Sequence, residues 1–417
     1  MSEPPAAPLT TADGVPLKVS LRRTVRRSKI KALLLVAPLL AFLFIAFLMP
    51  LFEMLWRSVD NPEVSTHLSR TVSALEGWNG ESLPDESAFA ALAEDLRVGQ
   101  QERNLGLLSS RLNYEKSGMR STISRTARRI GTLEPPYRES LIEVNDTWGE
   151  LDTWKLIQRE ASPYTISYYL AAVDRQLNAD GEIAKVPEHM QIHATLFWRT
   201  LWMSAVITGL TLALGFPVAF LLANLPTRHS NLLMILVLLP FWTSLLVRTT
   251  TWIAILQSQG VLNDVMVALG VIADEARWQM IHNKMGTIIA MTHILLPFMI
   301  LPLYSVMKTI PPSYMRAARS LGGKPFLSFR RVYFPLTIPG IAAGGILVFI
   351  LSIGYYITPA LVGGQSGRFI TNYIAYHMQT SLNWGLAAAI ASILLFVVII
   401  CYLVFNRLIG VDKVKLG

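Results

Sequence analysis

Six long apolar runs constrain this chain more than any other feature of its sequence. They cover residues 32–56, 197–223, 232–256, 286–307, 336–361 and 386–405. A helix rises 1.5 Å per residue, so about 20 apolar residues cross a hydrocarbon layer roughly 30 Å thick. Charged residues make up only 16% of the chain, whereas about 25% is usual in soluble domains. The sequence therefore predicts an all-α polytopic membrane protein with six transmembrane helices.

Basic residues mark one side of the predicted membrane. They gather before the first run (22–31), after the second (228–229), after the fourth (308–331) and after the last (407–415). Cytoplasmic loops of membrane proteins carry such an excess of Lys and Arg. We therefore expect the N-terminal tail (1–31) and the C-terminal tail (411–417) to be cytoplasmic. The same bias accounts for the net charge of +9 without a nucleic-acid partner.

The segment 57–193 differs in character, because it is charged and follows the first predicted span (32–56). Residues 84–97 place Phe89, Leu92 and Leu96 at helical spacing after an acidic first turn. Residues 141–157 form another candidate helix, which contains two tryptophans. We expect a helical extracytoplasmic insert between the first two spans. No grouping of His, Cys and carboxylates in it has catalytic or metal-ligand spacing, so we expect a structural or docking role.

Two absences bear on chemistry. Cys401 is the only cysteine, which excludes a disulfide within the chain and a cysteine metal cluster. The sequence contains no phosphate-binding loop of the form GxxxxGK[ST]. We therefore expect neither a catalytic site nor a bound metal or cofactor in this chain. If ATP drives the protein, a partner must hydrolyse it.

The basic loop between the fourth and fifth runs carries a spaced motif. Two small residues precede a glycine by three positions, and an apolar group ending in proline follows; the residues are Arg316, Ala317, Ala318, Gly322, Val332, Phe334 and Pro335. Small residues leave one helix face flat enough to enter a partner's groove, and glycine can take the left-handed conformation that ends a helix. Pro335 is expected to prevent simple continuation of the helix.

This motif resembles the coupling loop of bacterial ABC importer permeases, which implies a coupling loop over residues 311–340. One position departs, because Arg316 stands where that family usually has Glu. Residues 239–244 (LPFWTS), 355–364 and 383–385 further resemble permeases of spermidine/putrescine-type importers. Together these matches imply the type I ABC importer permease fold, with the permease core at 194–410, in a bacterial inner membrane.

The resemblance also implies partners and a mechanism. Such permeases pair with a second, related permease and dock on a cytoplasmic ATPase dimer that uses ATP and Mg. A periplasmic binding protein delivers the solute, and transport follows alternating access in contact with membrane lipid. For this chain the resemblance implies a small polar or cationic solute of polyamine type.

Six residues are candidates for the substrate pathway: Trp242, Thr243, Arg248, His293, Tyr355 and Tyr356. Ionisable side chains inside spans are costly and often functional, but Arg248 could instead snorkel to the interface and His293 could pack against Ser or a backbone carbonyl. The aromatic rings could bind an amine cation or anchor the chain at the membrane interface. Pro240 and Pro297 are expected to break helices near mid-membrane.

Several alternatives stay open. No acidic residue occurs between Glu275 and Asp412, although tight polyamine binding would favour carboxylates. The solute could therefore be another small molecule, such as an amino acid or an opine-like compound. A membrane sensor with an extracytoplasmic ligand domain and a secondary transporter are hypotheses from other classes. Against them stand the loop motif, the lack of a sizeable output domain, and the lack of coupling carboxylates and an inverted repeat.

Overall fold

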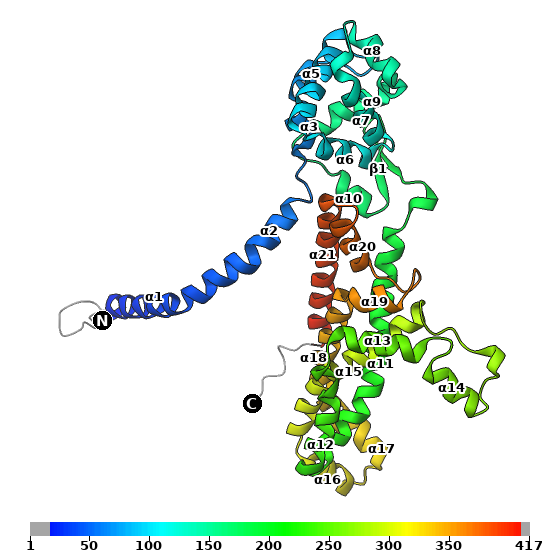
Figure 1. Ribbon diagram of the computed structural model, residues 1–417. Helices are drawn as coiled ribbons and strands as arrows, with labels where there is room; N and C mark the ends of the chain where they lie inside the picture. Colours follow the sequence, from blue (N-terminus) through cyan, green and yellow to red (C-terminus); the bar gives the residue numbers. More distant parts are fainter. Residues whose placement is uncertain (1–16, 410–417) are drawn as a thin grey trace, which may run out of the picture. The chain divides into compact units, whose positions relative to one another are not determined.

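The computed structural model describes residues 17–409 and divides into two units, Met1–Arg57 and Ser58–Gly417 (Figure 1). In the first unit, α1 (Leu17–Leu43), a π-helical turn (Phe44–Leu48) and α2 (Met49–Trp56) follow one another as one helical stretch. This helix begins well before the apolar run at residue 32, inside the segment expected to be a tail. The remaining tail residues, 1–16 and 410–417, lie outside the described part of the chain.

The insert is mostly helical. It contains α3 (Pro62–His67), α4 (Ser69–Ala74), α5 (Glu86–Glu102), α6 (Leu105–Glu115), α7 (Met119–Arg129), α8 (Tyr137–Val144), α9 (Leu151–Glu160) and α10 (Ser167–Ala172). The helix predicted over 84–97 is confirmed as α5, and its Phe89, Leu92 and Leu96 are fully buried. Trp148 and Trp154 are buried beside them, with Phe89 and Trp154 ring centroids 4.5 Å apart. The insert therefore has an apolar core of its own.

Two predictions for the insert need correction. The single helix predicted over 141–157 is two helices, α8 and α9, because the Asn145 side chain accepts a hydrogen bond from Thr147 N and starts a separate 3₁₀ turn. The sequence analysis also missed an antiparallel hairpin of β1 (Arg175–Leu177) and β2 (Ile183–Lys185). Strands of three residues are too short to give a recognisable alternation of apolar and polar residues.

The two ends of the helical part of the insert, near residues 59–61 and 163–165, are hydrogen-bonded to each other and form a narrow neck. Asn61 N donates to Pro163 O (2.9 Å), and Thr165 N donates to Val59 O (2.9 Å). Beside this neck, the buried Arg111 guanidinium bonds Asn61 Oδ1 (2.6 Å) and pairs with the Glu160 carboxylate, which is also buried. The two ends of the helical part are thus tied together in the folded chain.

The remaining helices form the apolar core. They are α11 (His193–Asn224), α12 (Thr227–Leu238), α13 (Leu245–Leu256), α14 (Val261–Ala268), α15 (Lys284–Thr309), α16 (Pro312–Ser320), α17 (Pro325–Ser328), α18 (Phe334–Gly354), α19 (Ile357–Val362), α20 (Ile370–Gln379) and α21 (Trp384–Ile409). Helices α11, α15 and α18 pack against one another (Figure 1). Gly344 permits close approach of α18 to α15, because a Cβ there would lie 2.8 Å from Met299 Sδ.

Five helical stretches in the described residues are long and apolar enough to cross a membrane, and a bent pair makes up to six. The bent pair is the third predicted run, which turns by 96° between residues 227–242 and 245–268. Pro240 lies in the 3₁₀ turn Leu239–Trp242 at this bend, as predicted. The break predicted at Pro297 is wrong, because α15 continues through Pro297 and Pro302. Buried packing against neighbouring helices holds that segment helical despite the missing amide.

Candidate functional site: a loop cavity and a bent third span

Helix α16 ends in a complete Schellman motif at the glycine singled out in the sequence. Gly322 has φ +85°, in the left-handed region. Gly322 N donates to Arg319 O (2.9 Å), and Gly323 N donates to Ala318 O (3.0 Å). A Cβ on Gly323 would lie 2.6 Å from Ser328 Oγ and 2.7 Å from Ala318 O, so the turn closes tightly. The end of α16 is therefore fixed by the backbone of two adjacent glycines.

After this turn a new helical stretch begins with α17 (Pro325–Ser328) and continues through Pro335. The break predicted at Pro335 is therefore wrong. α17 runs into a π-helical turn (Phe329–Tyr333), which runs into α18, where Pro335 occupies one of the first two positions. A proline removes one amide and its ring crowds the carbonyl four residues earlier. The wider π turn directly before it changes the hydrogen-bond spacing at this point, so the chain stays helical.

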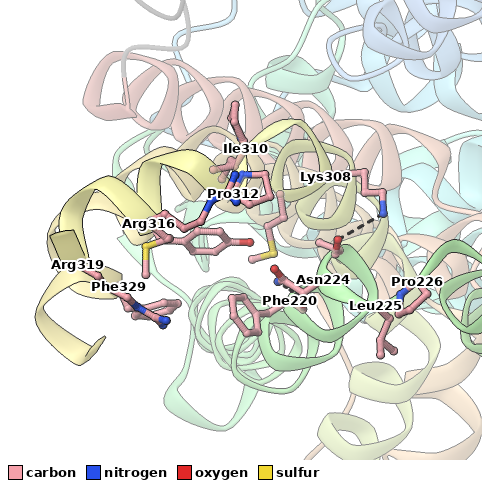
Figure 2. A pocket seen from close by; sticks show the side chains of 15 residues that line it. Phe220, Asn224, Leu225, Pro226, Lys308, Ile310, Pro312, Arg316, Arg319 and Phe329 are labelled. Carbon is pink, nitrogen blue, oxygen red and sulfur yellow. Dashed lines mark hydrogen bonds between the residues drawn. The ribbon is translucent and has the colours of Figure 1, made fainter. Parts of the chain in front are cut away.

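A cavity of about 710 Å³ lies between α16, the end of α11 and the end of α15 (Figure 2). Arg316, Arg319 and Lys308 line it, together with Asn224 and the aromatic side chain of Phe329. Lys308 Nζ donates weakly to Ala223 O (3.4 Å). Of the motif residues, the structure therefore brings Arg316 into a defined cavity.

The other motif residues lie around this cavity rather than in it. Ala317 is exposed and Ala318 is half-buried, which leaves the small face of α16 largely open. Val332 is half-buried, and the Phe334 ring lies 6.0 Å from the ring of Phe216 on α11. The ring of Phe334 therefore packs the end of the loop against α11.

The surface of the loop is both apolar and basic. Tyr314 is 50% exposed, Leu321 89% and Phe326 75%. In the described part of the chain, no ion pair involves Arg316, Arg319 or Lys324. Exposed apolar side chains of this size gathered on one loop are typical of a protein-binding surface. Arginines among them are typical of the same kind of surface.

Three of the six pathway candidates lie close together. Arg248 on α13 interacts electrostatically with His293 on α15 and with Tyr355 at the end of α18. His293 Nδ1 accepts a hydrogen bond from Trp252 Nε1 (3.1 Å), so its partner is an indole rather than the Ser or carbonyl expected. Trp252 is the residue that the candidate set omitted. Its distance from His293 along the chain gave no signal of the contact.

The other three candidates are placed differently. Trp242 is 76% exposed at the bend of the third run, and the Thr243 hydroxyl donates to Pro240 O (2.8 Å) within the same bend. Tyr356 is 42% exposed, and its carbonyl accepts from Asn372 Nδ2 (2.6 Å). Thr243 therefore stabilises the bend, while the two aromatic rings are free to contact lipid, solute or a partner.

A second cavity, of about 360 Å³, lies where the insert meets α11 and α20. His193 and His377 both line it, with ring centroids 6.1 Å apart. His193 Nδ1 bonds Asp174 Oδ1 (3.0 Å), and His377 Nδ1 bonds Ser381 Oγ (2.9 Å). Burial, with the nearby His193 as a smaller cause, lowers the pKa of His377 to about 4. His377 is therefore neutral near pH 7.

Within residues 17–409, no group of three or more His, Cys, Asp or Glu side chains is placed to hold a metal ion. The cavities described above are lined instead by hydrogen-bonding, aromatic and basic groups. They suit recognition of a partner or a solute.

Comparison with known proteins shows which family this chain resembles. A family model described as "Binding-protein-dependent transport system inner membrane component" matches residues 201–411. The spermidine/putrescine transport system permease protein PotB of Haemophilus influenzae is 34% identical over 228 residues, which cover 54% of this chain and 79% of that protein. PotB of Escherichia coli is 36% identical over 205 residues, which cover 49% and 74%. A solved bacterial ABC transporter for alginate import matches with TM-score 0.42 and 17% identity, over 53% and 80%.

The family match extends from α11 into the C-terminal residues, so it contains the loop cavity and the bent third run but not the insert. Proteins of this family are multi-pass components of the inner membrane and carry no catalytic site of their own. The chain therefore belongs to the family of binding-protein-dependent transport system inner membrane components, as a permease subunit of an ABC importer.

Proposed function

We propose that this permease forms half of the translocation pathway for a polyamine-type cation and couples to a separate ATPase through α16. The coupling role rests on one observation, which is the exposed end of α16 at Gly322, closed by two backbone hydrogen bonds. The segment of α16 and α17 joins α15 to α18 and presents exposed Leu321 and Phe326, so it can transmit motion of a docked partner to both helices. ATP and Mg would be used by that partner.

The proposal of a polyamine substrate rests on the two relatives that are permeases of spermidine/putrescine systems. Tyr355, Tyr356 and Trp242 offer ring faces to an amine cation, each contact worth on the order of 0.5–2 kcal/mol. Arg248 close to Tyr355 disfavours tight cation binding, so the periplasmic binding protein would supply most of the selectivity. An amino acid or an opine-like compound is the second candidate, because Arg248 would favour a carboxylate.

Alternating access would work as follows. ATP draws the two ATPase subunits together, the loops 311–340 of this permease and of a second, related permease move with them, and the pathway opens outward. Hydrolysis restores the inward-open state. Both termini and the loop would then be cytoplasmic, and the insert would face the binding protein. Membership of the permease family removes the reasons for the sensor and secondary-transporter hypotheses.

The test is uptake by proteoliposomes that contain the permease with its co-purified ATPase, second permease and binding protein. We expect ATP-dependent uptake of labelled spermidine or putrescine, and slower uptake in Tyr355→Ala. Uptake of an amino acid but of neither polyamine would keep the importer and reject the substrate. ATP-independent uptake would reject the coupling role.

A further inference from the structure

The loop between α15 and α18 has an unusual charge balance. It carries six basic residues, Lys308, Arg316, Arg319, Lys324, Arg330 and Arg331, and the nearest acidic residues along the sequence are Glu275 and Asp412. A basic excess by itself is ordinary for a cytoplasmic loop. The distinctive feature is that three of these cations, Lys308, Arg316 and Arg319, line a cavity with defined walls.

That cavity is rich in hydrogen-bond donors. Arg316, Arg319 and Lys308 contribute cationic donors. Tyr333 is 5% exposed, and its buried hydroxyl lies beside the Asn224 side chain without completing a hydrogen bond in the described structure. A buried hydroxyl without a hydrogen-bond partner lowers the stability of the folded chain, and binding of an acceptor would restore it. No Asp or Glu is among the described residues that line the cavity, so nothing in its walls neutralises the three cations.

We infer that the cavity receives the carboxylate of an Asp or Glu from the docked ATPase, held by Arg316 with Arg319. The inference rests on the proposed coupling function and adds the chemistry of the partner surface. A guanidinium binds a carboxylate through two parallel N–H···O bonds, which fixes orientation as well as affinity.

A protein carboxylate fits better than a lipid phosphate for a structural reason. Leu321 and Phe326, which are 89% and 75% exposed, lie on the same loop as the two arginines. Apolar anchors next to arginines are the composition of protein interfaces. The proposed docking surface therefore consists of the cavity together with Leu321 and Phe326.

The first experiment compares two charge reversals in nanodiscs. Arg316→Glu changes a residue of the cavity, while Arg331→Glu makes the same change on the same loop at an exposed position outside the cavity. We expect ATPase binding to weaken at least tenfold in R316E and less than threefold in R331E. Wild-type binding should also weaken as salt rises. Equal effects of the two variants would overturn the inference.

The second experiment keeps the charge and identifies the acid. Arg316→Lys supplies an amine, which a carbodiimide joins only to a carboxylate in direct contact. We expect an amide between this position and one Asp or Glu of the ATPase, identified by mass spectrometry. No amide to the ATPase, with the complex intact, would overturn the inference. An R316E defect that disappears in nanodiscs without anionic lipid would assign the cavity to a lipid headgroup instead.

These outcomes separate the two proposals. If wild-type permease binds the ATPase but R316E and R331E behave alike, only the acidic contact fails. If wild-type permease binds no ATPase at any salt concentration, the coupling function fails, and this inference fails with it.

Discussion

Gly322 offers the sharpest test of the coupling loop. Its φ of +85° is left-handed, and a Cβ built there meets no atom within 4 Å. The cost of Gly322→Val is therefore backbone strain without a steric clash. Left-handed backbone costs an L-residue roughly 1–2 kcal/mol, and more for a β-branched side chain. A loop that must hold this turn to dock should lose affinity by a factor of about 5–30.

Gly77 supplies a matched control. It also has φ +85° with no atom within 4 Å of a built Cβ, but it lies in the insert. Gly77→Val therefore carries the same local strain away from the loop. Gly322→Asn should recover much of the loss, because Asn tolerates the left-handed region better than other residues.

The assay measures ATPase affinity and ATP-dependent uptake in nanodiscs or proteoliposomes, with membrane insertion checked for each variant. We expect both quantities to fall in G322V, to recover largely in G322N and to stay near wild type in G77V. Normal uptake by G322V, or an equal loss in G77V, would refute the argument that the Schellman turn is part of the coupling.

Three further predictions concern the insert and the cavity where it meets α11 and α20. Arg111→Met removes one of the two arginine partners of the buried Glu160 and leaves only Arg159 paired with it (2.9 Å), so the insert should lose about 1–3 kcal/mol of stability and become sensitive to protease. Lys155→Met, which breaks a surface pair with Asp180, should not. The pKa of His377, about 4 against an ordinary 6.5, means that the unfolded chain binds more protons between these values. Stability should therefore fall as pH drops from 6.5 towards 4; thermal melts should show a weaker fall in His377→Gln and an unchanged one in exposed His189→Gln. Excising residues 62–162 and joining the ends with a short Gly/Ser linker keeps the neck and α10. The shortened protein should therefore still assemble in the membrane, as checked by size-exclusion chromatography. Deleting 65–185 also removes α10, which packs on α21, and assembly should suffer more; equal behaviour of the two deletions would contradict a supporting role for α10.

Much of this fold could be predicted from local features of the sequence. Apolar runs long enough to span a bilayer predict membrane helices because uncompensated backbone polar groups cannot sit in lipid. The helical spacing of Phe89, Leu92 and Leu96 predicts a buried face for the same reason that α5 has one. Gly322 could be recognised because only its residue type enters the left-handed region at little cost.

The tertiary structure decided what depends on contacts between distant residues. The hydrogen bond between Trp252 and His293 and the neck at Asn61 and Pro163 each join positions far apart in the chain. The prolines show the same division. Pro240 lies at a bend, whereas Pro297 is buried within a continuous helix, because packing around each residue, and not the residue alone, decides whether the lost hydrogen bond ends a helix. The loop cavity likewise exists only because α11 and α15 end at the same place and α16 runs beside these ends, which brings Arg316 and the hydroxyl of Tyr333 to a single site.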